Sequence, residues 1–296
     1  MNDIAISSKK CLICKGGKKN DCLHWHIDPE TKDIWVWCQG VCQRGYSLQT
    51  YCHLAGVSLS EFLKLDFDFQ EAKQNEVSRM DWPRTFVTMA DPRAKKGVEY
   101  VRSRGLTLDG DMYYDIEDEG IVFPYYVDNV FVGAQIRFIE SRMNADGEEW
   151  KITTLPGTRL GLLFYGWNQT ALSPSVQAIV VTEGAFNALS LQQALNTVYG
   201  GLYRNPWRVI AASGSGASQA QRDALKEIKD SGVKVVVAPD SDEAGFKMLN
   251  KYKDSEVATH YALTMDTEKD WNSMLQEIGH EELGKFFLRQ VKNINS

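Results

Sequence analysis

The second half of the chain alternates between short apolar runs and longer amphipathic segments. The apolar runs have the length of buried strands, and they cover residues 178–182, 207–212, 233–239 and 260–265. Helical periodicity marks the segments between them, at residues 185–194, 219–229 and 244–252. Alternation of buried strands with amphipathic helices is typical of crossover units. The pattern therefore predicts an α/β fold with a mostly parallel, helix-covered sheet.

The middle of the chain has a different pattern. Residues 98–106 have the periodicity of a helix, and Gly105 predicts its end. Two strand-like runs follow at 121–127 and 130–139, and Asp128-Asn129 between them predicts a hairpin turn. A helix beside antiparallel strands indicates an α+β subdomain.

The six cysteines set the N-terminal region apart, because all of them lie in the first 52 residues. The segment after this region has five acidic and two basic residues and no apolar period, which predicts a linker. At about 150 residues per domain, a chain of 296 residues has room for about two domains. The predicted organisation is a cysteine-rich module over 1–64, the linker over 65–81, the α+β subdomain over 82–175 and the α/β domain over 176–296.

Four of the cysteines have the spacing of a zinc site. Cys11 and Cys14 form one pair, separated by two residues. Cys38 and Cys42 form a second pair, separated by three residues and lying 23 residues beyond the first. Zinc prefers four soft ligands in a tetrahedron, and two cysteine pairs beside a β-hairpin supply them. Residues 33–37 predict one strand of that hairpin, so we expect a zinc-binding ribbon in this module.

The zinc ligand set is open at one point, because the second pair departs from the usual two-residue spacing. The alternative to the four paired cysteines is a set in which a residue between the pairs, Cys22, His24 or His26, replaces one of them. Otherwise Cys22 and Cys52 are interpreted as small buried residues. A zinc hairpin either stabilises a domain too small for a core or presents basic and aromatic side chains to single-stranded nucleic acid.

Acidic residues stand at the ends of the predicted strands of the α/β domain. Glu183 directly follows the first strand, and Asp240 and Asp242 follow the third. Asp270 precedes a final helical segment. The carboxyl ends of parallel strands share one edge of a sheet, so we expect the first three acids to converge there. Like charges this close are costly unless cations occupy the cluster, and hard oxygen ligands suit Mg2+ or Mn2+. The pattern predicts metal-assisted chemistry at a phosphodiester or triphosphate.

Taken singly, each of these acids has an equally good structural explanation. An acid in the first turn of a helix is stabilised by the helix dipole, and Asp240 and Asp242 are placed to cap the helix that follows them. Only the joint placement after successive strands favours the metal site. A glycine-rich segment, residues 213–218, fits the same edge of the sheet.

The net charge of −6, taken alone, argues against a large nucleic-acid footprint. Residues 105–130, however, carry seven acids and no Lys or Arg, so without them the chain has a net charge of +1. The acidic total is therefore local and does not exclude DNA. No apolar run approaches ~18 residues and the first residues lack the pattern of a signal peptide, so we expect a soluble, cytoplasmic protein without a membrane partner.

The α/β domain contains four motifs at the expected sheet edge: VTEGAFNAL (181–189), ASGSGAS (212–218), PDSDEAG (239–245) and KDWNSML (269–275). Together they resemble the Toprim domain of DnaG-type primases, and most closely the primase portion of phage primase-helicases. The N-terminal half of the family's RNA-polymerase core is similar to YVRSRGL (100–106), IVFPYYVDNVFVGAQIRF (121–138) and WKITTLPGTRLGLLFYGWN (150–168). A zinc module upstream of the core matches the family's order as well.

The resemblance implies a role for each matching position. It implies that Glu183, Asp240 and Asp242 bind the catalytic metal, that Asp270 is a weaker fourth acid, and that basic side chains contact nucleotide or template. The basic positions are Arg137 and Lys151, while Arg159 is more simply explained as a solvated strand residue.

The implied activity is that of a DNA-directed RNA polymerase that makes short RNA primers on single-stranded DNA during DNA replication. It would use ribonucleoside triphosphates, a structural Zn2+ and a catalytic Mg2+ or Mn2+. A separate helicase and polymerase are the expected partners, because the chain contains no P-loop. If the protein is phage-encoded, the compartment is the host cell cytoplasm.

Two other functions are compatible with these residues. One is strand cleavage by a Toprim nuclease or topoisomerase, although no tyrosine stands in a context that marks it as a nucleophile. The other is a zinc-ribbon protein that binds single-stranded DNA without catalysis. The presence of all the acids in the Toprim motifs argues against this second alternative.

Overall fold

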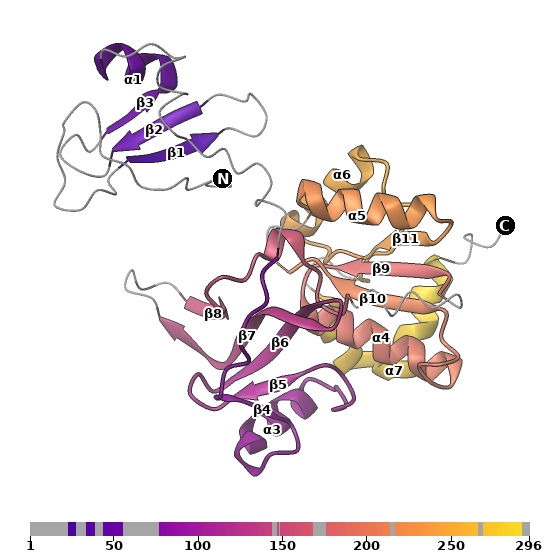
Figure 1. Cartoon of the computed structure of the whole chain (residues 1–296). Helices are drawn as coiled ribbons and strands as arrows, with labels where there is room; N and C mark the ends of the chain where they lie inside the picture. Colours follow the sequence, from indigo (N-terminus) through magenta and orange to yellow (C-terminus); the bar gives the residue numbers. More distant parts are fainter. Residues whose placement is uncertain are drawn as a thin grey trace. The chain divides into compact units, whose positions relative to one another are not determined.

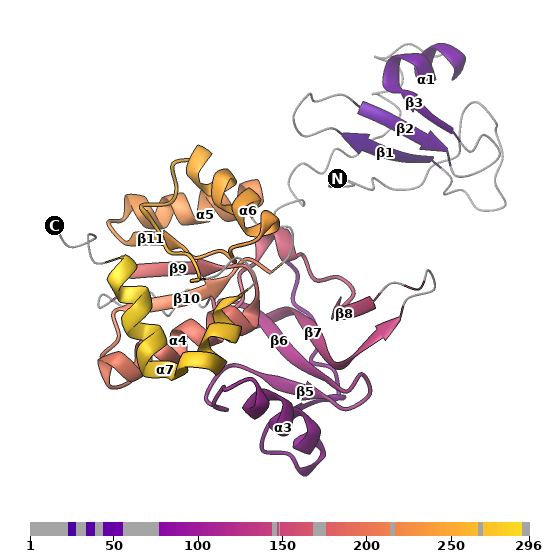
Figure 2. The same ribbon diagram turned by 180° about the vertical axis from the view of Figure 1, so that it is seen from behind.

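The structure is a computed structural model of the 296-residue chain (Figures 1 and 2). It describes residues 23–27, 34–38, 44–55, 77–143, 147, 149–167, 176–213, 217–265 and 269–291. The chain divides into two compact units, Met1–Gln74 and Asn75–Ser296, and the division falls within the segment predicted as a linker. The backbone N–H of Met80 donates to the carbonyl oxygen of Phe131 at 2.9 Å. The end of the predicted linker is thus hydrogen-bonded to the second unit.

The first unit contains a small antiparallel sheet followed by a helix. The sheet runs in the order β1 (Leu23–Ile27), β2 (Ile34–Cys38) and β3 (Arg44–Ser47), and α1 (Leu48–Ala55) follows directly. Val36 of β2 and Tyr51 of α1 are fully buried. The strand predicted over residues 33–37 is therefore confirmed as β2.

The predicted zinc ligands lie almost entirely outside the described residues. Of Cys11, Cys14, Cys38 and Cys42, only the backbone of Cys38 is described, at the end of β2. The zinc site therefore stays a prediction, and so does the part of Cys22, His24 and His26 in it. Cys52 of α1 is buried as predicted, and burial raises the pKa of its thiol.

The second unit begins with a five-stranded antiparallel sheet in chain order. Its strands are β4 (Phe86–Thr88), β5 (Tyr113–Asp115), β6 (Gly120–Val127), β7 (Val130–Met143) and β8 (Glu149–Thr154). Asp128 and Asn129 join β6 to β7 with φ of +50° and +63°, the two positive values of a tight hairpin turn. This confirms the predicted hairpin.

One helix connects β4 to β5. The short η2 (Pro92–Ala94) leads into α3 (Lys95–Ser103), and the chain leaves the helix through Gly105, whose φ is +73°. The predicted helix is confirmed, with an earlier start than the sequence pattern indicates.

The second sheet of this unit has four parallel strands in the order β10-β9-β11-β12. They are β9 (Ala178–Thr182), β10 (Trp207–Ala211), β11 (Lys234–Val237) and β12 (His260–Tyr261), and every adjacent pair is parallel. The predicted parallel sheet is confirmed. The fourth strand is shorter than predicted, because the backbone of Leu263 pairs with the side chain of Gln290 rather than with a strand.

Helices cover both faces of the parallel sheet (Figures 1 and 2). One face carries α4 (Ala185–Tyr199) and α7 (Trp271–Gln290), and the other carries α5 (Gln219–Asp230) and α6 (Glu243–Asp254). Successive side chains of β9 pack alternately against the helices on the two faces of the sheet. Val180 packs in the cluster of α4 and α7, while Ile179 and Val181 pack with α5 and α6. Burial on both faces explains the continuous apolar runs in the sequence.

The two sheets of the second unit share one hydrophobic core. The ring of Phe123 on β6 lies 5.3 Å from that of Tyr165 and 5.1 Å from that of Phe186 on α4. Tyr165 also pairs with Ala211 of β10 in an isolated bridge. Along the described residues, no helix combines the length and apolar character needed to cross a membrane.

Candidate active site

The four predicted acids all lie at the carboxyl edge of the parallel sheet. Glu183 is the first residue after β9 and precedes Gly184, the N-cap of α4. Asp240 follows β11, and Asp242 is the N-cap of α6. Asp270 is the N-cap of α7. The parallel topology therefore brings together Glu183, Asp240 and Asp242, as expected from the sequence, and Asp270 joins them from a third loop.

Each carboxylate is held by a donor of the protein. The N–H of Asp240 donates to Oε1 of Glu183 at 3.1 Å, which joins two of the loops directly. Asp242 accepts from the N–H of Gly245 at 2.8 Å, and Asp270 accepts from the N–H of Ser273 at 2.6 Å. Asp242 and Asp270 therefore cap helices and also belong to the acid cluster, so the structural and the functional explanation hold together.

Burial and mutual repulsion raise the pKa of the central acid. Desolvation, followed by the charges of Glu183, Asp270 and Asp242, raises the pKa of Asp240 to about 8. Burial also raises the pKa of Glu183, with a contribution from the charge of Asp242 and an opposing one from the N–H of Asp240. The four acids therefore form one electrostatic cluster, in which ionisation of Glu183, Asp242 or Asp270 opposes that of Asp240.

The acid cluster fits a divalent cation by the chemistry of its donors. Among the described residues, no three His, Cys, Asp or Glu side chains are gathered into a set that would hold one ion. Mg2+ does not require such a set, because it usually keeps several waters and takes one or two carboxylates from the protein. The carboxylates supply the hard oxygen donors that such an ion prefers. Repulsion among them contributes to raising the pKa of Asp240 to about 8, and a bound cation would offset this repulsion.

A close contact at Gly245 makes this part of the site sensitive to a single methyl group. A Cβ at Gly245 would overlap the carbonyl oxygen of Asp240 and lie 2.6 Å from Oε1 of Glu183. We expect Gly245→Ala to destabilise the protein by about 1–3 kcal/mol in urea unfolding, because the backbone at Asp240 has to move. The matched control is Gly184→Ala, where a Cβ next to the same Glu183 meets no atom within 4 Å. Equal effects of the two substitutions would contradict this expectation.

The start of the glycine-rich segment also lies at this edge. The N–H of Ser213 donates to the carbonyl oxygen of Glu183 at 2.9 Å. Ser213 adopts a positive φ of +46°, so the chain turns sharply where β10 ends. Residues 214–216 lie outside the described part of the chain.

The predicted basic residues lie on the antiparallel sheet rather than among the acids. Arg137 on β7 is half-buried and aligned with Ile152 of β8. Lys151, the neighbour of Ile152 in the strand, pairs with Glu149 at 2.7 Å. The hydrogen bond from Lys151, together with the charges of Lys151 and Arg137, lowers the pKa of Glu149. Arg159 is the N-cap of the short η3 (Leu160–Leu162). In the described structure, neither Arg137 nor Lys151 makes a hydrogen bond or ion pair with the four acids.

The sequence reasoning missed a buried amide beside the acids. The side chain of Asn187, on the first turn of α4, donates from Nδ2 to Oδ1 of Asp240 at 2.8 Å. Asn187 is 5% exposed and stands between the core residues Ala185 and Ala188. The available signal was a polar residue among the apolar positions of this helix, one turn after Glu183.

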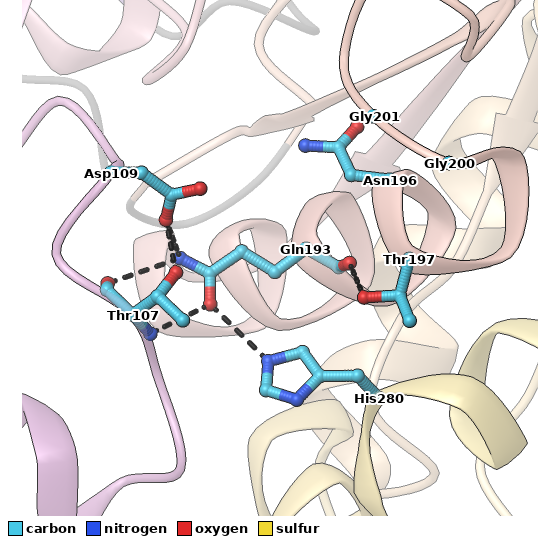
Figure 3. A pocket seen from close by; sticks show the side chains of 8 residues that line it. All are labelled: Thr107, Asp109, Gln193, Asn196, Thr197, Gly200, Gly201 and His280. Atoms are coloured by element: carbon cyan, nitrogen blue, oxygen red, sulfur yellow. Dashed lines mark hydrogen bonds between the residues drawn. The ribbon is translucent and has the colours of Figure 1, made fainter.

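A separate hollow lies at the opposite end of α4 (Figure 3). It has a volume of about 330 Å3, and Gln193 is one of the residues that line it. The amide of Gln193 exchanges hydrogen bonds with the backbone of Thr107 and also donates to Asp109 at 3.0 Å. His280 approaches the same amide oxygen at 3.4 Å. Because the amide is already paired and the hollow contains none of the predicted site residues, the acid cluster remains the candidate site.

Comparison with known proteins supports the fold of the second unit. Residues 180–275 match a family described as Toprim-like. The RNA polymerase domain of Mycobacterium tuberculosis primase DnaG, in complex with a double-stranded DNA oligomer with a 6-nucleotide overhang, is 15% identical with a TM-score of 0.51. That match covers 68% of this chain and 75% of the other. The resemblance to DnaG-type primases is therefore confirmed at the level of the fold.

A second structure covers more of the chain at lower similarity. The primase fragment of the bacteriophage T7 primase-helicase protein is 18% identical with a TM-score of 0.41, covering 97% of this chain and 100% of the other. No curated protein matches the chain.

Proposed function

We propose that this protein is a DNA primase, a nucleotidyltransferase that synthesises short RNA primers on single-stranded DNA. The observation that carries the proposal is the convergence of Glu183, Asp240, Asp242 and Asp270 at one edge of a Toprim-like sheet. The shared fold with a primase RNA polymerase domain supports the same activity. The antiparallel sheet packed on this domain is part of the proposed catalytic core.

The acids would act as a preorganised site for Mg2+ or Mn2+. Of Glu183, Asp240 and Asp242, one or two would bind the cation directly and the others through its waters. The bound cation would activate a 3′-hydroxyl and neutralise charge on the triphosphate. Glu183 is held by the N–H of Asp240, and Asp240 by the amide of Asn187. Asp270 adds negative charge from the N-terminus of α7. Because helix ends and buried amides fix these groups, little reorganisation accompanies the reaction.

The remaining parts of the proposal concern substrates and partners. Arg137 and Lys151 would bind phosphates of nucleotide or template from the antiparallel sheet. Structural zinc in the first unit would be held by Cys11, Cys14, Cys38 and Cys42, and this unit would contact the template. We further propose a cytoplasmic enzyme that uses ribonucleoside triphosphates and works with a separate helicase and polymerase.

One assay separates the proposal from its two alternatives. Single-stranded DNA of mixed sequence is incubated with labelled ribonucleotides and Mg2+ or Mn2+, and the products are resolved on a sequencing gel. We expect a ladder of short RNAs that depends on both template and metal. Shortened DNA would instead indicate a Toprim nuclease, and retardation of the DNA without new products would indicate a binding protein.

A further inference from the structure

A hydrogen-bonded chain begins at Arg104, a half-buried residue at the C-terminus of α3. Its Nη1 donates to the side-chain oxygen of Asn272 at 3.0 Å, and its Nη2 donates to the hydroxyl of Tyr100 at 3.0 Å. The guanidinium also lies over the ring of Phe186 on α4, 5.1 Å from its centroid. These contacts fix the planar guanidinium between the antiparallel subdomain and the helices of the parallel sheet.

Asn272 is hydrogen-bonded both to Arg104 and to Asn187, the amide that contacts Asp240. It is fully buried, two residues after Asp270 in the first turn of α7. Its Nδ2 donates to the carbonyl oxygen of Arg104 at 3.0 Å and to Oγ of Ser190 at 2.9 Å. Both ends of the amide are therefore occupied, and a buried amide satisfied in this way has one stable orientation.

The orientation of Asn187 depends on the position of the Asn272 backbone, at the start of α7. The backbone N–H of Asn272 donates to Oδ1 of Asn187 at 3.2 Å, so the oxygen of this amide is already used. Its Nδ2 must then face Asp240, where it donates to Oδ1 at 2.8 Å. The rotamer of Asp240 is thus connected to Arg104 through two buried asparagines.

We propose that Arg104 is a positioning residue for the acid cluster, acting through Asn272 and Asn187 on Asp240. Arg104 contacts none of the four acids, so its effect reaches the site by holding the first turn of α7. Without the guanidinium, the oxygen of Asn272 retains only the amide of Gln276, at 3.1 Å. The inference deepens the proposed function, and it rests on that function only in that Asp240 binds a divalent cation.

The test is the affinity for a divalent cation in the full chain, measured without DNA or nucleotide. We would titrate Mn2+ by calorimetry into wild type, Arg104→Gln, Asn187→Leu and the double variant. Groups that orient a metal ligand typically contribute about 10-fold or more to affinity. We expect about 10-fold weaker binding for Asn187→Leu and about 3-fold for Arg104→Gln, which is one step further away. The double variant should bind as weakly as Asn187→Leu, because both changes interrupt one chain of contacts.

Two control variants distinguish positioning from general stability. Arg102→Gln removes the same charge from an exposed position on the same helix, and it should bind Mn2+ as wild type does. Arg104→Lys keeps the charge but not the planar pair of donors, and it should fall between wild type and Arg104→Gln. Thermal unfolding of each variant reports any loss of fold.

Several results would overturn the proposal. One is an unchanged Mn2+ affinity in Arg104→Gln, whether or not its melting temperature falls. Another is a double variant in which the two losses of affinity add. The third is a wild-type protein that does not bind Mn2+. The primase proposal fails separately, because it requires RNA products and this one does not. A chain that binds Mn2+ through the Arg104 connection but makes no RNA would overturn only the primase proposal.

Discussion

Replacing Glu183 by glutamine is expected to reduce primer synthesis by about 10²- to 10³-fold, the usual effect of removing one group that stabilises developing charge. Glutamine has the same shape, and its oxygen still accepts from the N–H of Asp240, so the loop keeps its structure. What is lost is the negative charge that the Glu183 carboxylate contributes to the acid cluster. The measurement is the rate of RNA product formation on single-stranded DNA at saturating ribonucleotides and Mg2+.

The control for this variant is Glu243→Gln. Glu243 is an exposed acid in the first turn of α6 and pairs with Lys247 at 2.7 Å. Its replacement changes the net charge of the protein by the same amount, close to the site but outside the cluster. We expect wild-type rates from it. If Glu183→Gln retained full primer synthesis, the proposed mechanism would be wrong.

The second large effect is expected in stability without divalent cation. The pKa of Asp240 is about 8 in the folded protein, against an ordinary value of 3.8. Between these values the unfolded chain has released a proton that the folded protein retains, so the free energy of unfolding falls as pH rises. Asp240→Asn removes this contribution. We expect the variant to exceed wild type in unfolding free energy by an amount that grows from pH 4 to pH 8, reaching on the order of 2 kcal/mol, since partial contact with water screens the repulsion.

Urea unfolding in EDTA at several pH values measures this difference. Asp230→Asn, at an exposed position at the end of α5, is the control, and its effect should be small at every pH. Adding Mg2+ at pH 8 should reduce or reverse the advantage of Asp240→Asn, because a cation bound to the folded protein stabilises wild type. A difference between wild type and Asp240→Asn that does not vary with pH would contradict the expected burial of this charge.

Much of the fold follows from sequence patterns that depend on local physics. The bounds of β9 agree with its apolar run, because a strand buried on both faces shows as a continuous run. The hairpin follows from Asp128-Asn129, since both residues tolerate positive φ. The shortening of the last strand to His260–Tyr261 does not follow, because it depends on a contact between Leu263 and Gln290 of α7.

The residues of the candidate site likewise include some that the sequence predicts and others that it does not. Glu183, Asp240 and Asp242 are predictable, because parallel topology alone brings strand ends to one edge. The place of Asn187 beside Asp240 could not be predicted, because it depends on how α4 is rotated about its axis. The pairing of Arg104 with Asn272 joins residues 168 positions apart. The periodicity of apolar residues cannot predict a contact between residues so far apart in the sequence. The pairing of Arg137 with Ile152 likewise depends on the register of β7 with β8.

The capping role of Asp242 and Asp270 has a consequence for how related sequences should vary. In a lineage that had lost catalysis, selection for the folded state would still retain a capping side chain at both positions, so asparagine or serine would replace aspartate there. Glu183 caps no helix, and its position would drift more freely. Among descendants of this protein, the residue at position 183 is therefore the better marker of surviving activity than either aspartate.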